Sequence, residues 1–367
     1  MSGDILADVR ALAPTLRAQA AEAEQNRAPT PSAIQHLKQA KLLSMLLPKQ
    51  RGGRDLALVE YARVLIEVAR GDLSIGWVVH VLNGNHLAVR SRSEATQAIL
   101  LGGDANIISG GVLPVGRARE VAGGYVVEGI WHNCTAVRFT DWVFGGVLVV
   151  DKAGQTQPGL GFAYMPTADI FVRESWFAVG LMGTGSDSFV AKGIHVPAAR
   201  MILPNSSGTV CKHGPLFIPA VVRAGFLALL LGGAMTVHEL TQQATRAKVR
   251  QSSVALAQLS KAAAQIETAR LVLLEILEKL DEVRDAGAEL APDDRASHEV
   301  RAAHIVELIH GAVEASMFIA GSSALMHANP LSRYWRDMHV GLRHLSTPHV
   351  AHEVADLDGV LSFPHVV

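Results

Sequence analysis

Cysteine is scarce in this sequence, since only Cys134 and Cys211 occur among 367 residues. A small secreted fold held together by disulfides needs more cysteines, spaced more densely along the chain. The two cysteines also lie too far apart for the paired spacing of a zinc site. We therefore expect two free thiols and a protein of a reducing compartment, the cytoplasm.

Excess charge and long apolar runs are lacking as well. The chain has 33 Lys and Arg against 34 Asp and Glu, so its net charge of -1 gives no attraction to nucleic acid or to an anionic membrane. The longest apolar run, around Phe226 to Met235, is well short of the roughly 20 residues that a membrane span needs. No charged segment followed by an apolar stretch opens the sequence, so it predicts no signal peptide.

Several signatures of catalytic and metal sites are also missing. The sequence has no Gly-x-Ser-x-Gly elbow, no P-loop, and no dinucleotide fingerprint after a strand. His339 and His344 lie five residues apart, and His349 and His352 lie three apart. No carboxylate pattern joins them into a triad of two histidines and one carboxylate. The sequence therefore predicts no metal site.

The pattern of residues divides the chain into three segments. A chain of 367 residues is longer than one compact core usually holds, so more than one sub-domain is expected. Residues 1–104 show apolar residues at helical spacing. Residues 105–205 are rich in Val, Ile and Gly, with turn signals at Gly110-Gly111, Gly123-Gly124 and 151–154. Residues 206–367 again show helical spacing. We expect a mainly α fold with a central β-domain: an N-terminal helical domain, a small β-barrel or sandwich, and a C-terminal four-helix bundle.

The individual elements follow from the same patterns. Strands are predicted at Ala105–Ile108, Tyr125–Trp131, Trp142–Val150, Gly161–Pro166, Phe171–Ser175 and Phe189–Val196. The bundle helices are predicted at Ala220–Lys248, Val254–Arg284, Ser297–Ala320 and Ser332–Val354. The third of these is apolar on more than one face, which favours burial against a second copy of the chain.

Two segments of the β-domain are candidates for ligand binding. Thr135 lies in a break between two predicted strands, with Trp131 and Trp142 on either side. Backbone and hydroxyl groups at such a break can bind a ligand because no strand pairing uses them, although an ordinary surface loop explains the same pattern. The Gly-rich run Gly180–Ser186 could bring its backbone close to a phosphate or a flat ligand, or it could be a plain turn.

The three segments and four motifs together resemble the acyl-CoA dehydrogenase superfamily, over nearly the whole chain. The most specific motif is Pro330–Asp337, which resembles that family's Pro-Leu-x-Arg-x-x-Arg-Asp signature. Three further motifs resemble its flavin-binding segments: Asn133-Cys134-Thr135 followed by Trp142, Gly180–Ser186 followed by Val196-Pro197, and Ala320–Leu325.

The end of the signature points to one branch of that superfamily. Acyl-CoA dehydrogenases carry a catalytic glutamate soon after Arg-Asp, but residues 338–347 contain no carboxylate. Without such a base, no group removes the proton α to a thioester. The run Arg-Asp-x-His-x-x-x-x-His instead resembles the oxygenase components of two-component flavin monooxygenases such as p-hydroxyphenylacetate hydroxylase.

That resemblance implies a reaction and its partners. Such enzymes take reduced flavin from a separate reductase, form a C4a-(hydro)peroxyflavin with O2, and oxygenate a small aromatic or indole-like substrate. The implied cofactor is reduced FMN or FADH2. We also expect a homotetramer, without a nucleic-acid or membrane partner.

The resemblance also assigns roles to single residues. Thr135 takes the place of the hydroxyl near flavin N5, and His344 matches a histidine that deprotonates a phenol or manages the peroxide proton. The second role suits a side chain that titrates near neutrality. His86 and Ser109 fall where related hydroxylases hold their substrate.

Further residues are implied to bind the flavin. Arg246 and Arg250 could contact a flavin phosphate, although a solvated helix end also explains them. Arg336 and Asp337 are expected to form a structural ion pair. The remaining implied flavin contacts are Asn133, Ser186, Ser322 and Ser323.

Two alternatives stay open. The chain could be a flavin-dependent acyl-CoA dehydrogenase if Glu239, Glu267 or Glu314 supplied the base. It could also be a catalytically idle homologue that serves as a scaffold. Asn133 supports that second alternative, because it replaces the aromatic residue that packs on the flavin in the family.

Overall fold

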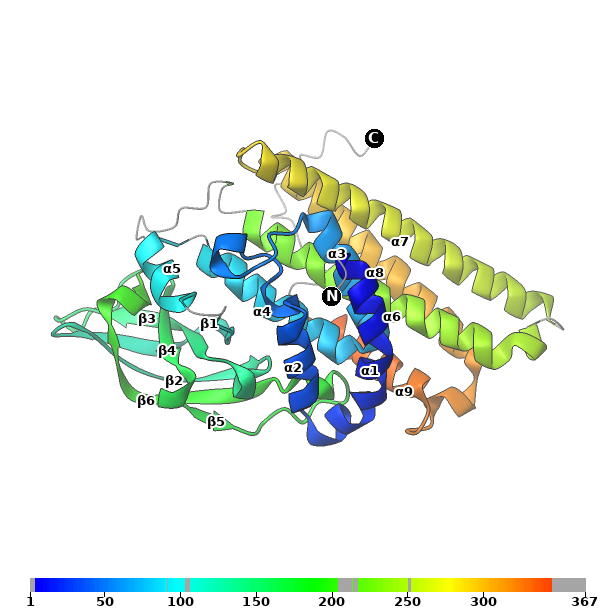
Figure 1. The fold of residues 1–367 in the computed structure, drawn as a ribbon, viewed down its shortest axis with the longest axis horizontal. Helices are drawn as coiled ribbons and strands as arrows, with labels where there is room; N and C mark the ends of the chain where they lie inside the picture. Colours follow the sequence, from blue (N-terminus) through cyan, green and yellow to red (C-terminus); the bar gives the residue numbers. More distant parts are fainter. Residues whose placement is uncertain are drawn as a thin grey trace.

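The structure is a computed structural model, and it describes residues 4–90, 92–102, 106–203, 213, 217–249 and 252–344. A β-sheet forms one end of the long axis, and long helices form the other end (Figure 1). The shorter N-terminal helices lie between the two. Cys211, Arg250, His349 and His352 are outside the described residues.

Five helices form the N-terminal part: α1 (Ile5–Asn26), α2 (Pro31–Gln39), α3 (Leu58–Gly71), α4 (Leu73–Arg90) and α5 (Glu94–Leu100). Local capping explains where they begin. The Asp4 carboxylate accepts from two backbone N–H groups at the start of α1, and Thr30 does the same for one group in α2. Ser93 caps α5, a short helix that the apolar pattern did not predict. The central helix α4 is buried along most of its length, against α3 and α6.

Seven strands form one mixed sheet in the order β5-β6-β2-β1-β3-β4-β7. Among the described strands, β1 and β3 pair in parallel and the other neighbours are antiparallel. Buried side chains of β2 and β6 meet those of β3 and β4 in one core around Trp131 and Phe189, so the sheet curls over its own interior. The strands are β1 (Ile108–Val121), β2 (Gly124–Cys134), β3 (Trp142–Val150), β4 (Gly161–Pro166), β5 (Phe171–Arg173), β6 (Asp187–Pro197) and β7 (Met201–Ile202).

The first strand begins and ends later in the chain than predicted, and the predicted first residue, Ala105, lies outside the described residues. The strand was expected at Ala105–Ile108 with a turn at Gly110-Gly111, but β1 begins at Ile108 and continues through these glycines. Gly111 faces Trp131, where an added Cβ would lie 3.2 Å from the Trp131 Cβ. Gly111 therefore gives room for a buried indole, and Gly110 gives room for Phe144 on the neighbouring strand. Local sequence does not distinguish this use of glycine from turn formation.

Four more helices follow in the described residues: α6 (Phe217–Val249), α7 (Ser253–Asp285), α8 (Pro292–Ala320) and α9 (Pro330–Gly341). Helix α9 ends at Gly341, well before the predicted end at Val354, and residues beyond 344 are outside the described range. Side chains of α6, α8 and α9 share one hydrophobic core with α1, α3 and α4. The two helical parts of the chain are therefore packed together.

Two of these helices are long and apolar enough to cross a membrane by length and composition alone: Phe217–Arg246 and Pro292–Ala320. In their most apolar windows, 72% and 56% of the residues are buried inside the protein. Core helices of soluble proteins have the same properties, so this observation is weak support for a membrane span.

Candidate active site

Thr135 lies on a sharp turn directly after β2. Asn133 and Ala136, on either side of it, have φ values of +59° and +53°, so the backbone turns away from the sheet. The Thr135 hydroxyl lies 3.1 Å from the Ser186 hydroxyl, and Ser109 donates a 2.6 Å hydrogen bond to the Thr135 carbonyl oxygen. The structure therefore brings together three of the predicted site residues.

The Gly-rich run forms a second turn that packs against the first. Thr184 donates from its hydroxyl to the Leu181 carbonyl at 2.8 Å, and the same hydroxyl lies 2.8 Å from that of Ser186. The Ala136 N–H donates to the Thr184 carbonyl at 2.9 Å. A chain of hydroxyls thus runs from Thr135 through Ser186 to Thr184. We call these three side chains the hydroxyl cluster, and sequence reasoning did not include Thr184.

Helix α9 holds this second turn in place. The Asp337 carboxylate accepts a 2.6 Å hydrogen bond from the Leu181 N–H. Arg336 instead pairs with Glu24 at 2.5 Å and donates to the Val179 carbonyl. The predicted Arg336–Asp337 ion pair is therefore wrong, because neighbouring helical residues point about 100° apart and reach different partners. Burial, together with the nearby Asp72 carboxylate, raises the pKa of Asp337 to about 8.

His344 follows α9 and lies against two aromatic rings. Its ring centroid is 5.1 Å from that of Trp77 on α4 and 4.5 Å from that of Phe226 on α6. Burial lowers the pKa of His344 to about 4, so the imidazole is neutral at pH 7. The expectation that it titrates near neutrality is therefore wrong, because the sequence does not show the two rings that surround it.

His80 extends the same group of rings. Its Nδ1 lies 2.9 Å from the Tyr61 hydroxyl and its Nε2 lies 2.9 Å from the Val222 carbonyl oxygen. Its ring centroid lies 4.4 Å from that of Phe226. Burial lowers the pKa of His80 to about 3. We call Trp77, His80, Phe226 and His344 the aromatic–histidine cluster.

The far end of α4 is fixed to the start of β1. The His86 Nε2 lies 2.7 Å from the Asn106 carbonyl oxygen, and the Asn85 side chain donates to the Ile108 carbonyl at 2.9 Å. Ser109 comes next in the chain, so α4, β1 and the Thr135 turn are joined by consecutive contacts. Both His86 and Ser109 are fully buried in the described chain.

The other implied flavin contacts lie elsewhere. Arg246 is exposed near the end of α6, and Ser322 and Ser323 are exposed just after α8. The start of α7 packs against the end of α8 through Leu259 and Ile319, so these residues share one end of the bundle. Figure 1 places the facing ends of α6 and α7 far from the sheet. One chain therefore does not bring these residues to Thr135.

Comparison with known proteins places this fold in a family. Residues 4–100 match the acyl-CoA dehydrogenase N-terminal domain, and residues 228–348 match the acyl-CoA dehydrogenase C-terminal domain. The chain belongs to the acyl-CoA dehydrogenase superfamily. The match confirms both the resemblance seen in the sequence and the predicted fold class.

Several relatives that match this chain over nearly its whole length are named as oxygenase components. The chain is 26% identical to the oxygenase subunit HsaA of a flavin-dependent monooxygenase from Rhodococcus jostii, over 91% of this chain and 92% of the relative. It is 24% identical to the oxygenase component of an FADH2-dependent resorcinol hydroxylase from a Rhizobium species, over 92% and 89%. The structure of XiaF from a Streptomyces species, in complex with FADH2 and glycerol, superposes with a TM-score of 0.90 at 21% identity, over 99% and 96%.

Proposed function

We propose that this chain is the oxygenase component of a two-component flavin-dependent monooxygenase. It would use O2 and reduced FMN or FADH2 from a separate reductase to oxygenate a small aromatic or indole-like substrate. The observation that carries the proposal is the hydroxyl cluster, joined through Leu181 and Asp337 to a helix whose end offers a histidine and no glutamate. The names of the relatives support the same reaction.

The hydroxyl cluster fits the polar edge of a flavin. Each hydroxyl can donate one hydrogen bond and accept others, so Thr135 can turn toward a ligand while Ser186 and Thr184 keep the network paired. Thr135 and Ser186 each keep a 4% exposed edge. Bound reduced flavin supplies the electrons that activate O2, and we propose that Thr135 orients it and that Asn133 borders it.

His344 would manage a proton in this site. A neutral imidazole accepts a proton from a phenol, and Trp77 and Phe226 pack against the His344 ring. The apolar surroundings of His344 also lower its pKa, which makes it a weaker base. We propose that the substrate lies beside this ring and toward Ser109 and His86, where the contacts of α4 with β1 fix the wall of the site.

The three glutamates that could serve as the base of a dehydrogenase are exposed and paired. Glu239 pairs with Arg70 at 2.8 Å and Glu267 with Arg270 at 2.6 Å, while Glu314 lies 2.8 Å from the His339 Nε2. Their side chains are 43%, 56% and 46% exposed. A carboxylate that is exposed to water and already paired with a cation or an imidazole is poorly placed to remove a weakly acidic proton from carbon.

We further propose that the protein works in the cytoplasm as a homotetramer. Leu256, Phe318 and Met326, at the bundle end defined above, are 57%, 81% and 67% exposed, an apolar surface typical of an interface. If this end docks onto a second copy, Arg246, Ser322 and Ser323 of one chain could reach a flavin held by another. This arrangement would unite the two separate groups of flavin-binding candidates.

Stopped-flow absorbance tests the proposed function. The protein is mixed anaerobically with reduced FMN or FADH2 and then with oxygenated buffer, and the return of the oxidised flavin spectrum is followed. We expect the wild type to slow this return at least tenfold relative to flavin in solution. Thr135→Ala should lose most of that delay, whereas the control Thr167→Ala, on a different turn of the β-domain, should keep it.

Other outcomes would identify the alternatives. Reduction of bound oxidised flavin by an acyl-CoA alone, without oxygen, would establish the dehydrogenase. Failure to bind either flavin in either redox state would favour the idle homologue.

A further inference from the structure

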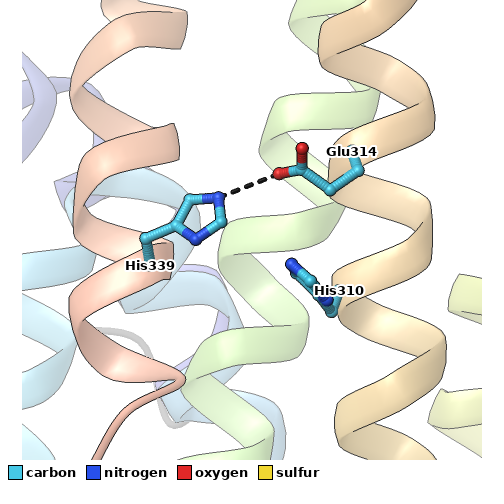
Figure 2. A group of neighbouring side chains, drawn as sticks. All are labelled: His310, Glu314 and His339. Atoms are coloured by element: carbon cyan, nitrogen blue, oxygen red, sulfur yellow. Dashed lines mark hydrogen bonds and ion pairs between the residues drawn. The ribbon is translucent and has the colours of Figure 1, made fainter.

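Two histidines and one glutamate converge between α8 and α9, away from the hydroxyl cluster. His310 and Glu314 lie on α8, and His339 faces them from α9 (Figure 2). One possible ligand atom from each side chain lies within 4.8 Å of the other two. We propose that His310, Glu314 and His339 bind a divalent first-row transition metal such as Zn²⁺, and we call them the interhelix triad.

The backbone geometry fits this role. His310 and Glu314 are four residues apart on one helix, so their side chains lie on the same face one turn apart. His339 comes from a second helix, and its Nε2 lies 2.8 Å from the Glu314 Oε1. Ligand atoms around tetrahedral zinc are separated by roughly 3.4 Å, from bond lengths near 2.1 Å. The triad reaches that spacing through small rotations of its side chains.

The chemistry of the triad suits a transition metal. Two imidazoles and one carboxylate are nitrogen and oxygen ligands that zinc, iron, cobalt and nickel accept, whereas magnesium and calcium prefer oxygen ligands alone. Three protein ligands leave a coordination position for water. The side chains of His339 and Glu314 are 28% and 46% exposed, so an ion can enter from solvent.

A neighbouring tryptophan orients the triad. The Trp335 Nε1 donates a 2.9 Å hydrogen bond to the Glu314 Oε1, and its ring contacts that of His339 edge to face at 4.6 Å. Hydrogen bonds of this kind fix the direction of metal ligands and increase affinity. The indole therefore holds the same carboxylate oxygen that faces His339.

A second His–Glu pair on α8 shows what the triad adds. His304 Nδ1 and Glu307 lie 3.4 Å apart, and their side chains are 56% and 59% exposed. This pair belongs to no group of three possible ligands within the part of the chain that the structure describes. It serves as a matched control, because it offers the same two ligand types on the same helix.

Metal binding would join α9 to α8. Helix α9 carries Asp337, which holds the Leu181 turn beside the hydroxyl cluster. A bound ion would therefore stiffen the support of that turn without contacting it. The inference does not depend on the proposed oxygenase reaction, since its readout is metal binding alone.

The experiment is a titration of the full-length, tag-free protein at pH 7.5. Co²⁺ binding is followed by visible absorption and Zn²⁺ binding by calorimetry, after treatment with a chelator. We expect one ion per chain, with affinity reduced at least tenfold in Glu314→Gln and in His339→Ala, and unchanged in His304→Ala. His310→Ala gives a second test on α8 if the α9 variant fails to fold.

Equal affinity in the wild type and in a triad variant that keeps its circular dichroism spectrum would overturn the proposal. So would a His304→Ala effect as large as that of Glu314→Gln, because binding would then be general to surface histidines.

Discussion

Two groups of histidines in this chain lie in opposite environments. His80 and His344 lie among Trp77, Phe226 and Tyr61, and burial lowers the pKa of each to about 3 and about 4. His310 and His339 lie beside the exposed Glu314 carboxylate. Apolar surroundings disfavour a charged imidazole, whereas a neighbouring carboxylate attracts a positive charge. The same residue type therefore lies in an apolar cluster in one place and beside a carboxylate in another.

The largest effect is expected from disrupting the apolar environment. Phe226→Ala removes a ring that is 3% exposed and contacts Trp77, His80 and His344. We expect a loss of about 3–5 kcal/mol in the free energy of unfolding, measured with guanidinium chloride. The control Phe171→Ala, at a ring that is 63% exposed, should change stability by less than about 1 kcal/mol. Similar losses in both variants would show that this cluster is not a special core.

The next largest effect is expected from lowering the pH, which should protonate His344 and destabilise the folded chain. The pKa of His344 is lower in the folded chain than in the unfolded one, so its contribution to stability is complete above about pH 6.5. That contribution is lost as the pH falls from there through about 4. We expect up to about 3 kcal/mol of lost stability from this residue, measured by unfolding at pH 7.5 and pH 4.5. His344→Gln should show a smaller acid loss, and an unchanged loss would place the titrating group elsewhere.

The same substitution also tests the proton-transfer role. We expect His344→Gln to lower product formation with a phenolic substrate about 100-fold, because glutamine cannot accept a proton. Binding of reduced flavin, measured by anaerobic titration, should stay within about twofold of the wild type. Full activity in this variant would remove His344 from the proposed mechanism.

The smallest effect on stability is expected from a substitution in the interhelix triad when no metal is bound. Glu314 is 46% exposed, and exposed ion pairs contribute about 0.5 kcal/mol. Glu314→Gln in chelator-treated buffer should therefore change the free energy of unfolding by less than about 1 kcal/mol, as measured by urea unfolding. A much larger loss would mean that the carboxylate is a structural support of α9 and would weaken the contrast between the two groups.

Much of the architecture could be predicted from the chain alone. Apolar spacing placed the long helices, and the Pro330–Asp337 signature identified the superfamily that the domain matches confirm. The predictions failed where contacts between distant parts of the chain determine the local structure. Gly110 and Gly111 suggested a turn, but they lie within β1 because the adjacent strands bring Trp131 and Phe144 against them. The short helix α5 was missed because seven residues give little periodicity.

The candidate site also combines residues that the sequence identified with contacts that only the fold revealed. The sequence by itself determined which residues are available: Thr135 in a strand break, Ser186 in a Gly-rich run, and His344 after the signature. Only the tertiary structure decided that Thr184 completes the hydroxyl cluster, that Arg336 and Asp337 have different partners, and that Glu314 meets His339. The physical reason is that protonation and ligand geometry depend on neighbours from distant parts of the chain, whereas motifs and periodicity record only local order.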